Sequence, residues 1–275
     1  MVLGWESRSM VISAPFEVFE PRTGHTPVVV EVPHAGLFMD PESMAHCVAP
    51  VMSLAADADL YVDELVMDLF EEGATIIASR WSRYVLDLNR APDDVDGRSV
   101  RGATASSCPH GLLWRETRSG CQALRQPVEP QELQRRLDCF YKPYHGALDE
   151  VVEHRCQRFG TVVVLSMHSM PSEGVDADVV IGTLGRSTAS DRLVDGLEKA
   201  VRAFGLRVVH DVPYAGGATT ARLGKPQAGM HAMQVEVARR LYMNERTFCR
   251  YPEGFSMVRS LCRTMVATMG RAAVG

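Results

Sequence analysis

Two segments of the chain share one hydrophobic pattern, a run of mostly β-branched residues that leads directly to a histidine. Residues 28–33 read Val-Val-Val-Glu-Val-Pro before His34, and residues 161–167 read Thr-Val-Val-Val-Leu-Ser-Met before His168. Short apolar runs of this kind predict buried strands. In open α/β sheets, reactive groups collect at the carboxyl ends of strands. We therefore expect both histidines to face one crevice and to share a metal ion, as in a metal-dependent hydrolase.

Strand-like and helix-like patterns alternate along the rest of the chain. Apolar residues at helical spacing predict helices over 57–72, over 130–159 with a break near Pro143, over 190–204 and over 254–269. Strands are predicted at 74–79, 84–88, 161–166, 178–181 and 206–209, and the segment 230–237 is also strand-like. The polar stretch 91–121 predicts a long loop over the sheet edge. This alternation favours an α/β fold in which helical layers enclose a largely parallel sheet.

Composition excludes several classes of protein. A chain of 275 residues can form one large core, so we expect a single domain over residues 1–275. The 29 basic and 34 acidic residues give a formal charge of −5 without a basic stripe, which argues against nucleic acid or an anionic membrane as a partner. The seven cysteines form no C-x-x-C pair, which disfavours a disulfide framework and a cysteine zinc site. A soluble, cytoplasmic enzyme is therefore expected.

Several short motifs occur in order between about residues 25 and 245. They are Val-Pro-His-Ala-Gly at 32–36, Asp-Ala-Asp-Leu-Tyr-Val-Asp-Glu-Leu at 57–65, Ser-Arg-Tyr-Val-Leu-Asp-Leu-Asn-Arg at 82–90, Tyr-Lys-Pro-Tyr-His at 141–145, Met-His-Ser at 167–169, Gly-Gly-Ala-Thr-Thr at 216–220, and a run from Gly229 through His231, Gln234 and Glu236 to Met243. This ordered set resembles the N-formylglutamate amidohydrolase family, the deformylases of histidine breakdown.

The resemblance implies a fold and a kind of metal site. The fold is a three-layer α/β/α sandwich with a mixed, mostly parallel sheet of the zinc-carboxypeptidase, or phosphorylase/hydrolase-like, type. The metal is expected on two histidines and a carboxylate, with His34 and His168 as the histidines. Zinc is the expected metal, with cobalt and manganese as alternatives. Such zinc sites keep one position open for water, whose pKa falls to about 7.

The sequence identifies the carboxylate ligand less directly than the two histidines. The carboxypeptidase pattern has a glutamate three residues after the first histidine, but that position is Leu37 here. Asp57, Asp59 and Asp63 are the candidates. We expect Asp59, because it opens the predicted helix beside the first strand and its side chain should point the same way as that of Asp63, one turn on. The alternative is that these aspartates are only charges at a helix N-terminus.

Glu236 is the expected general base. It lies in Gln234-Val235-Glu236-Val237, an apolar setting in which a buried carboxyl group has a raised pKa. It would take a proton from water and then pass it to the leaving amine. The alternative is a surface glutamate on a half-exposed strand.

The substrate of the family has two carboxylates, so cations are expected around it. Arg90, beside Asn89, is expected either to bind a carboxylate through two hydrogen bonds or to act catalytically by stabilising the oxyanion. The alternative is that Arg90 only pairs with a neighbouring aspartate. The further candidates for substrate binding are Asn89, Arg83, His145, Arg222 and Lys225.

The expected reaction is the hydrolysis of N-formyl-L-glutamate to formate and L-glutamate. A hydrolase of the same fold could instead act on another N-acyl amino acid or a small peptide, because only the pocket would differ. The loop over 91–121 should shape that pocket. The more distant alternative is a binding protein that kept the sheet and lost the metal. The sequence leaves the oligomeric state open.

Overall fold

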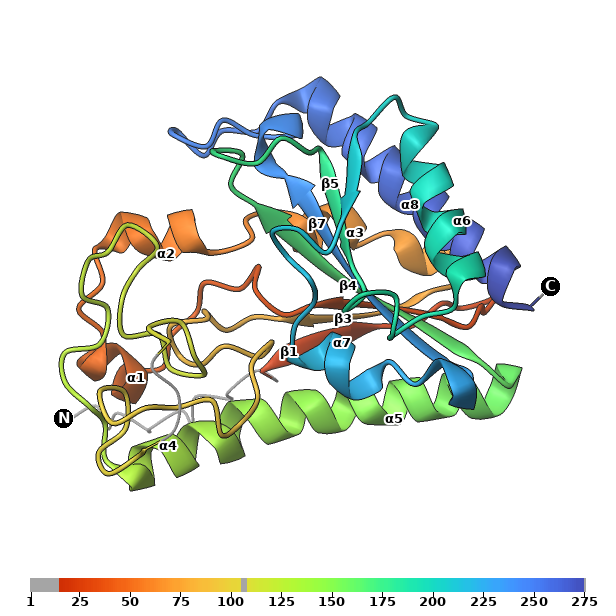
Figure 1. Cartoon of the computed structure of the whole chain (residues 1–275). Helices are drawn as coiled ribbons and strands as arrows, with labels where there is room; N and C mark the ends of the chain where they lie inside the picture. The colour runs from red at the N-terminus through yellow and green to blue at the C-terminus, as the bar shows by residue number, and fades with distance from the viewer. Residues whose placement is uncertain (1–14, 105–107, 275) are drawn as a thin grey trace, which may run out of the picture.

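Seven strands form one mixed sheet within residues 15–104 and 108–274, the part of the chain that the computed structural model describes (Figure 1). The strand order is β1-β3-β2-β4-β7-β5-β6. The strands are β1 (Phe16–Phe19), β2 (Val28–Val32), β3 (Thr75–Ser79), β4 (Val162–Met170), β5 (Val179–Gly182), β6 (Val208–His210) and β7 (Met230–Ala238). The four central strands β3, β2, β4 and β7 are parallel, whereas β1 is antiparallel to β3 and β5 is antiparallel to β7. The expected mixed, mostly parallel sheet is confirmed.

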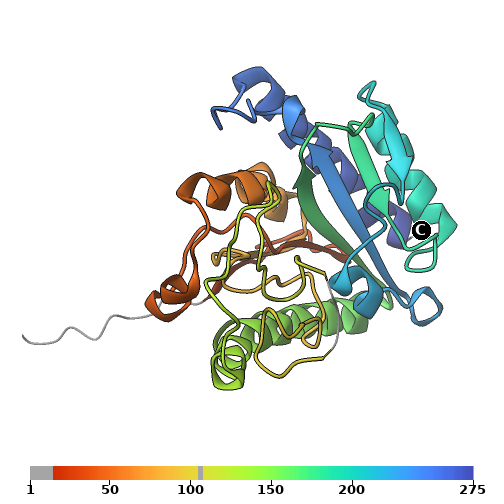
Figure 2. The same cartoon turned by 60° about the vertical axis from the view of Figure 1, so that its left-hand side comes forward.

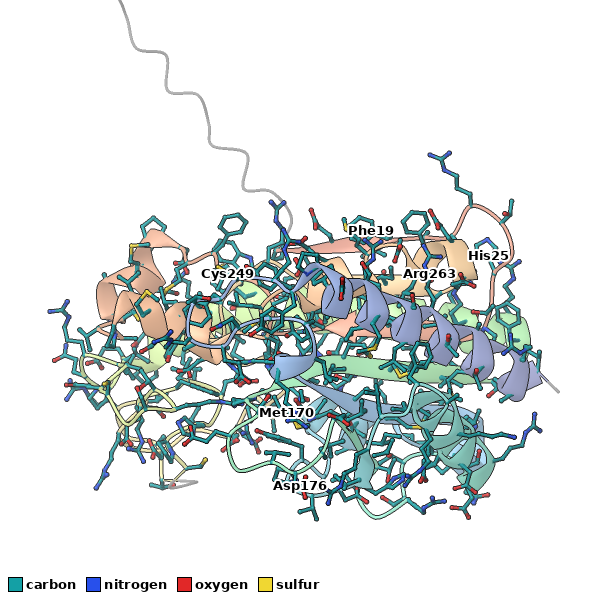
Figure 3. The ribbon with its side chains drawn as sticks, turned by 90° about the horizontal axis from the view of Figure 1, so that it is seen from above. Phe19, His25, Met170, Asp176, Cys249 and Arg263 are labelled. Carbon is teal, nitrogen blue, oxygen red and sulfur yellow. The ribbon has the colours of Figure 1, made fainter. Side chains whose placement is uncertain are left out.

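Helices cover both faces of this sheet and complete the three layers. One face packs against α3 (Val62–Val66), α6 (Asp191–Arg202) and α8 (Pro252–Val274). The opposite face packs against α5 (Lys142–Phe159), with α4 (Pro130–Arg136) and α7 (Ala218–Leu223) on the same side (Figures 1 and 2). Figure 3 looks down on the layer that contains α8, where Arg263 is labelled. Every residue of β2 and β4 is buried, because both faces of these strands are covered.

The long helix before β4 forms with the predicted irregularity. Between α4 and α5, residues Leu137–Tyr141 make a π-helical turn, and Pro143 follows it at the start of α5. Proline has no N–H to donate to the preceding turn, which disfavours regular α-helical geometry at this point. The helices predicted over 190–204 and 254–269 correspond to α6 and α8. No helix in the described ranges combines the length and apolar composition that crossing a bilayer requires.

The single helix predicted over 57–72 is wrong. α2 (Val51–Asp57) ends where that helix should begin, α3 follows after a break, and a 3₁₀ turn covers Leu69–Glu72. At the break, Tyr61 has the left-handed φ of 69°, which no helix interior accepts. The backbone N–H of Asp59 donates to the carbonyl of His34 at 3.0 Å instead of to the preceding helical turn. Asp59 therefore opens no helix, and the segment lies against the end of β2.

The strand predicted over 84–88 is also wrong. The run is apolar and buried, but it forms consecutive turns in which Val85 N donates to Ser82 O and Arg90 N donates to Asp87 O. These local hydrogen bonds satisfy backbone groups of a segment whose apolar pattern alone predicts a strand. Two strand boundaries differ as well, because β4 continues past Ser166 to Met170 and the short edge strand β1 was not predicted. The remaining elements are the helix α1 (Pro41–His46) and the 3₁₀ turns η3 (Pro226–Ala228) and η4 (Arg239–Leu241).

Candidate metal centre and active site

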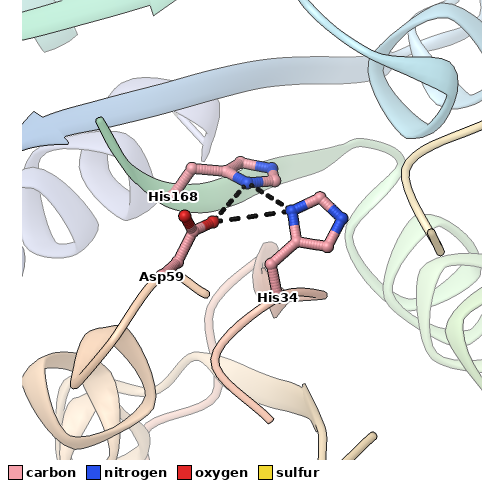
Figure 4. Close-up of side chains that lie close together, drawn as sticks. All are labelled: His34, Asp59 and His168. Atoms are coloured by element: carbon pink, nitrogen blue, oxygen red, sulfur yellow. Dashed lines mark hydrogen bonds and ion pairs between the residues drawn. The ribbon is translucent and has the colours of Figure 1, made fainter. Parts of the chain in front are cut away.

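Three buried side chains converge where the central strands end at their carboxyl edge. His34 follows β2 by two residues, His168 lies in β4, and Asp59 lies in the break between α2 and α3. Figure 4 shows the three side chains pointing at one another from these separate segments. The hydrogen bond from Asp59 N to His34 O fixes the position of Asp59 beside the first histidine. Of the three aspartate candidates, only Asp59 belongs to this cluster of possible ligands.

The spacing of the three side chains fits a small divalent cation. The two Nδ1 atoms of His34 and His168 lie 3.2 Å apart, and Asp59 Oδ2 lies 3.0 Å from His168 Nδ1 and 3.5 Å from His34 Nδ1. A tetrahedral ion with metal–ligand distances of 2.0–2.1 Å separates its ligands by about 3.3 Å. The three atoms therefore have the spacing of three ligands on one face of such a tetrahedron.

The outer nitrogen of each imidazole has its own acceptor. His34 Nε2 donates to Asp87 Oδ1 at 2.7 Å, and His168 Nε2 donates to Ser166 Oγ at 3.0 Å. Hydrogen bonds of this kind fix the tautomer of a metal-binding histidine. A cation bound between the two rings would take the Nδ1 lone pairs, in place of the contacts that His168 Nδ1 makes with Asp59 Oδ2 and that His34 Nδ1 makes with Arg83 Nη2.

The contact between His168 and Ser166 extends to a buried carboxylate. The Ser166 hydroxyl donates to Glu31 Oε2 at 2.6 Å, and Glu31 has no exposed surface. Thr219 Oγ1 and the Tyr144 hydroxyl donate to Glu31 Oε1 at 3.0 and 3.3 Å. Because Glu31 accepts from Ser166, the serine oxygen remains oriented to accept from His168.

The electrostatics of the cluster favour a bound cation. Burial opposes ionisation of Asp59, but hydrogen bonds and charges from His168 and His34 outweigh it and hold the pKa of Asp59 well below its usual range. Burial also disfavours a charged His168, yet the hydrogen bond to Asp59 and the charge of Glu236 raise the pKa of this imidazole. Asp59 is thus held in the ionised form that a metal ligand requires.

Glu236 stands beside the metal centre on β7. In the register of β4 and β7 it is the direct partner of His168. Gln234 Nε2 donates to Glu236 Oε1 at 2.8 Å, and Asn89 Nδ2 donates to Gln234 Oε1 at 3.1 Å, so the carboxylate has a fixed orientation. Burial, reinforced by the charge of Asp59, raises the pKa of Glu236. A carboxylate with a raised pKa is a stronger proton acceptor than an ordinary glutamate.

These groups line a pocket of about 500 Å³. Among the described residues, its walls hold three carboxylates, those of Asp59, Asp87 and Glu236, and three guanidinium groups, those of Arg83, Arg90 and Arg118. Residues 213–217 form another part of the wall. The formal side-chain charges of these acids and arginines cancel, so a divalent cation would leave the pocket positive.

Arg83 is the most buried of the three arginines. It donates from Nη2 to Asp87 Oδ2 at 3.0 Å and from Nη1 to Asp57 O at 3.0 Å, and its guanidinium lies 4.3 Å from the centre of the Trp114 ring. Its Nη2 atom is also 3.0 Å from His34 Nδ1. Arg83 is therefore held at the metal centre itself.

Asn89 and Arg90 follow the turns that replace the predicted strand. Asn89 is buried, and its Oδ1 accepts from Thr219 N at 3.2 Å. The backbone comes so close here that a Cβ on Gly217 would lie 2.2 Å from Asn89 Nδ2. Arg90 is partly exposed, and in the described part of the chain its side chain has no hydrogen bond or ion pair.

The structure does not bring the other three predicted substrate residues into this pocket. His145 is buried on α5, where Nε2 donates to Leu88 O at 3.0 Å and Nδ1 accepts from Arg222 Nη2 at 3.2 Å. Burial, helped by the charge of Arg222, lowers the pKa of His145 to about 4. Arg222 and Lys225 line a separate cavity beside Asp149. His145 thus has structural hydrogen bonds on both ring nitrogens.

Sequence reasoning missed several residues of the pocket wall. His110, Trp114 and Arg118 come from the loop over 91–121, and Asp87 comes from the turns before Asn89. The length and polarity of the loop indicated a role in shaping the pocket, but no local pattern singled out these positions. They reach the pocket only through the tertiary fold.

Comparisons with known proteins identify the family of the chain. The family model described as N-formylglutamate amidohydrolase matches residues 26–243. An N-formylglutamate deformylase from Pseudomonas putida is 30% identical over 239 residues, which cover 84% of this chain and 86% of the relative. The crystal structure of N-formylglutamate amidohydrolase from Ralstonia eutropha JMP134 superposes with a TM-score of 0.86 at 30% identity, over 94% of this chain and 98% of that one. A gene product of Agrobacterium tumefaciens, 21% identical, shares the fold with a TM-score of 0.67 over 94% of this chain and 95% of its own. The chain therefore belongs to the N-formylglutamate amidohydrolase family.

Proposed function

We propose that this protein is a metal-dependent amidohydrolase that cleaves N-formyl-L-glutamate to formate and L-glutamate. The observation that carries the proposal is the convergence of His34, Asp59 and His168 with Glu236 in one pocket that also contains arginines. The names of the relatives, N-formylglutamate deformylase and amidohydrolase, support the choice of substrate. The reaction would place the protein in histidine breakdown. Its seven cysteines without C-x-x-C spacing support a cytoplasmic location.

The proposed metal is zinc, held by His34 Nδ1, His168 Nδ1 and a carboxylate oxygen of Asp59. Two imidazoles and one carboxylate are a common catalytic zinc set, although cobalt and manganese accept the same donors. A divalent ion at this position would supply Lewis-acid catalysis, because it polarises a carbonyl and lowers the pKa of water to about 7. The fit rests on the ligand spacings near 3.3 Å and on the two Nδ1 atoms, which face each other and Asp59.

Glu236 would carry the proton through the reaction. Its carboxylate takes a proton from the attacking water while a C–O bond forms at the formyl carbon. It then gives that proton to the nitrogen of glutamate as the C–N bond breaks, so formate and the free amine are the products. The hydrogen bond from Gln234 holds the carboxylate in place, and burial raises its pKa, which favours the protonated form that the second step requires.

Arginines would complete the site. Arg83 lies 3.0 Å from His34 Nδ1, which supports the role of stabilising the oxyanion that develops beside the metal ligands. Arg90 has no partner among the described residues, which supports binding of a substrate carboxylate. Asn89 would support this arrangement by its hydrogen bond to Gln234.

Formate release from N-formyl-L-glutamate tests the proposal. Purified protein is loaded with zinc, treated with a chelator, and then reloaded, and formate is measured at each stage. Release that stops on chelation and returns on reloading would support the metal, the reaction and the substrate together. Absence of formate from protein that binds one zinc ion per chain would refute the substrate, and a panel of other N-acyl amino acids and small peptides would then identify the reaction.

A further inference from the structure

Arg118 is a cation of the pocket wall that the reaction described above does not use. It belongs to the loop over 91–121, and its backbone N–H donates to Asp57 Oδ2 at 3.2 Å. Asp57 is buried at the end of α2, and it accepts a second hydrogen bond from the Tyr84 hydroxyl. The Arg118 side chain is exposed and lines the pocket. The loop is thus anchored at the backbone of Arg118, whose side chain has no hydrogen bond or ion pair with the described residues.

The three pocket arginines differ in how far their donors are already used. Arg83 is bound to Asp87 and to the carbonyl of Asp57. Within the described ranges, neither Arg90 nor Arg118 has a side-chain hydrogen bond or an ion pair. Two guanidinium groups without internal partners therefore face a pocket in which we propose a substrate with two carboxylates. Guanidinium and carboxylate groups match in shape and can form paired hydrogen bonds.

Their positions assign one carboxylate to each. Arg90 is partly buried and follows Asn89, whose Nδ2 is 3.4 Å from His168 Nε2, whereas the Arg118 side chain is exposed. The α-carboxylate of N-formylglutamate is two bonds from the amide nitrogen, and the γ-carboxylate is four bonds away. The inner arginine therefore suits the α-carboxylate, and the exposed Arg118 suits the γ-carboxylate.

We propose that Arg118 is the residue that selects a carboxylate at the distal end of the substrate side chain. This inference rests on the proposed function and adds the residue that distinguishes glutamate from neutral amino acids. Arg118 lines the same pocket of about 500 Å³ as Glu236 and the three candidate metal ligands. A substrate held at the metal centre can therefore extend toward Arg118.

The test compares two substrates of nearly equal shape, N-formyl-L-glutamate and N-formyl-L-glutamine, on zinc-loaded wild type and Arg118→Met. The variant should raise KM for N-formyl-L-glutamate about tenfold or more, with kcat changed by less than about threefold, because the contact exists before and during the reaction. Activity on N-formyl-L-glutamine should stay the same. Arg118→Lys should restore part of the preference for glutamate. Arg125→Met is the matched control, because Arg125 is another exposed arginine close in sequence that does not line the pocket.

The outcomes separate this inference from the proposed function. An equal loss of kcat/KM for both substrates, or no change for either, would overturn the role of Arg118. Failure of wild type to release formate would instead overturn the proposed function. Equilibrium binding of glutarate and butyrate to the zinc-loaded protein then tests Arg118 without turnover. Weaker binding of glutarate alone in Arg118→Met would support the distal carboxylate site, and equal binding by variant and wild type would refute it.

Discussion

His168 and Glu236 are direct partners across the parallel strands β4 and β7. One is a ligand of the candidate metal centre, and the other is the candidate base. Because residues that are paired in a sheet project to the same face, this register places the base beside the metal without any loop. The same register pairs Ser166 with Gln234, so the residues that orient His168 and Glu236 lie in the next row.

Replacing Glu236 should separate metal binding from turnover. Glu236→Gln keeps the shape of the side chain but removes the proton acceptor, so kcat should fall by about 10²- to 10⁴-fold. Zinc content, measured by elemental analysis, should remain at the wild-type level because Glu236 is not one of the three ligands. A variant that retains wild-type kcat would show that another group moves the proton.

Asp59 and Asp63 offer a matched pair for the carboxylate ligand. Asp59 is buried against both histidines, whereas the nearby Asp63 is exposed on α3. Asp59→Asn should therefore weaken zinc binding strongly, and Asp63→Asn should leave it unchanged. Competition with a chromophoric chelator measures both affinities. Equal weakening in the two variants, or loss only in Asp63→Asn, would contradict the assignment.

Ser166 should matter for metal affinity although it touches no metal. Ser166→Ala removes the acceptor that keeps His168 Nε2 protonated and Nδ1 available, and it leaves Glu31 without one of its donors. Loss of such a contact weakens zinc binding by about 10- to 100-fold. Ser79→Ala is the control, because Ser79 is a buried serine at the end of β3 whose hydroxyl contacts Trp81. Equal zinc affinities in the two variants would show that Ser166 does not orient His168.

His145 should make the protein sensitive to acid. Its pKa is about 4 in the folded state, against the ordinary value of 6.5. Between pH 6.5 and pH 4 the unfolded chain binds a proton at His145 and the folded protein does not. The contribution of His145 to the free energy of unfolding is therefore fully present above pH 6.5, and it decreases as the pH falls toward 4. Between pH 7 and pH 5 this group should cost about 2 kcal/mol of unfolding free energy. Denaturant titrations of metal-free protein at both pH values measure the loss.

The variant His145→Gln should show a pH-dependent loss that is smaller by about 2 kcal/mol, whatever its stability at pH 7. His154→Gln serves as the control, since His154 is exposed on the same helix α5. An unchanged pH dependence in His145→Gln would mean that His145 gains its proton equally in both states.

The sequence predicted the site best where a functional residue directly follows the strand that positions it. The runs before His34 and His168 predicted both strands and the edge at which the histidines meet. Periodicity failed for residues 57–72 and 84–88, where contacts from distant segments decide the backbone conformation. The hydrogen bond from Asp59 N to His34 O is one such contact. Asp59 was therefore the expected ligand, but for an incorrect structural reason.

Residues of the pocket wall were the hardest to foresee. Arg222 and Lys225 carry the right charge and lie in a glycine-containing segment, yet they line a different cavity. Arg118 lies in a loop without periodic pattern, and only the contact of its backbone with Asp57 brings it to the pocket. Charge in a sequence predicts which ligands a protein could bind, but the direction in which a loop residue points depends on its long-range contacts.

The pairing of β4 with β7 also links enzymatic activity to correct strand register. Nine consecutive residues of each strand are in register, from Val162 with Met230 to Met170 with Ala238. Shifting one strand by a single residue would turn Gln234 and Glu236 to the opposite face together. A molecule with slipped strands would therefore lack the candidate base in the pocket altogether. Under the proposed mechanism, only molecules whose central strands are correctly paired would be active.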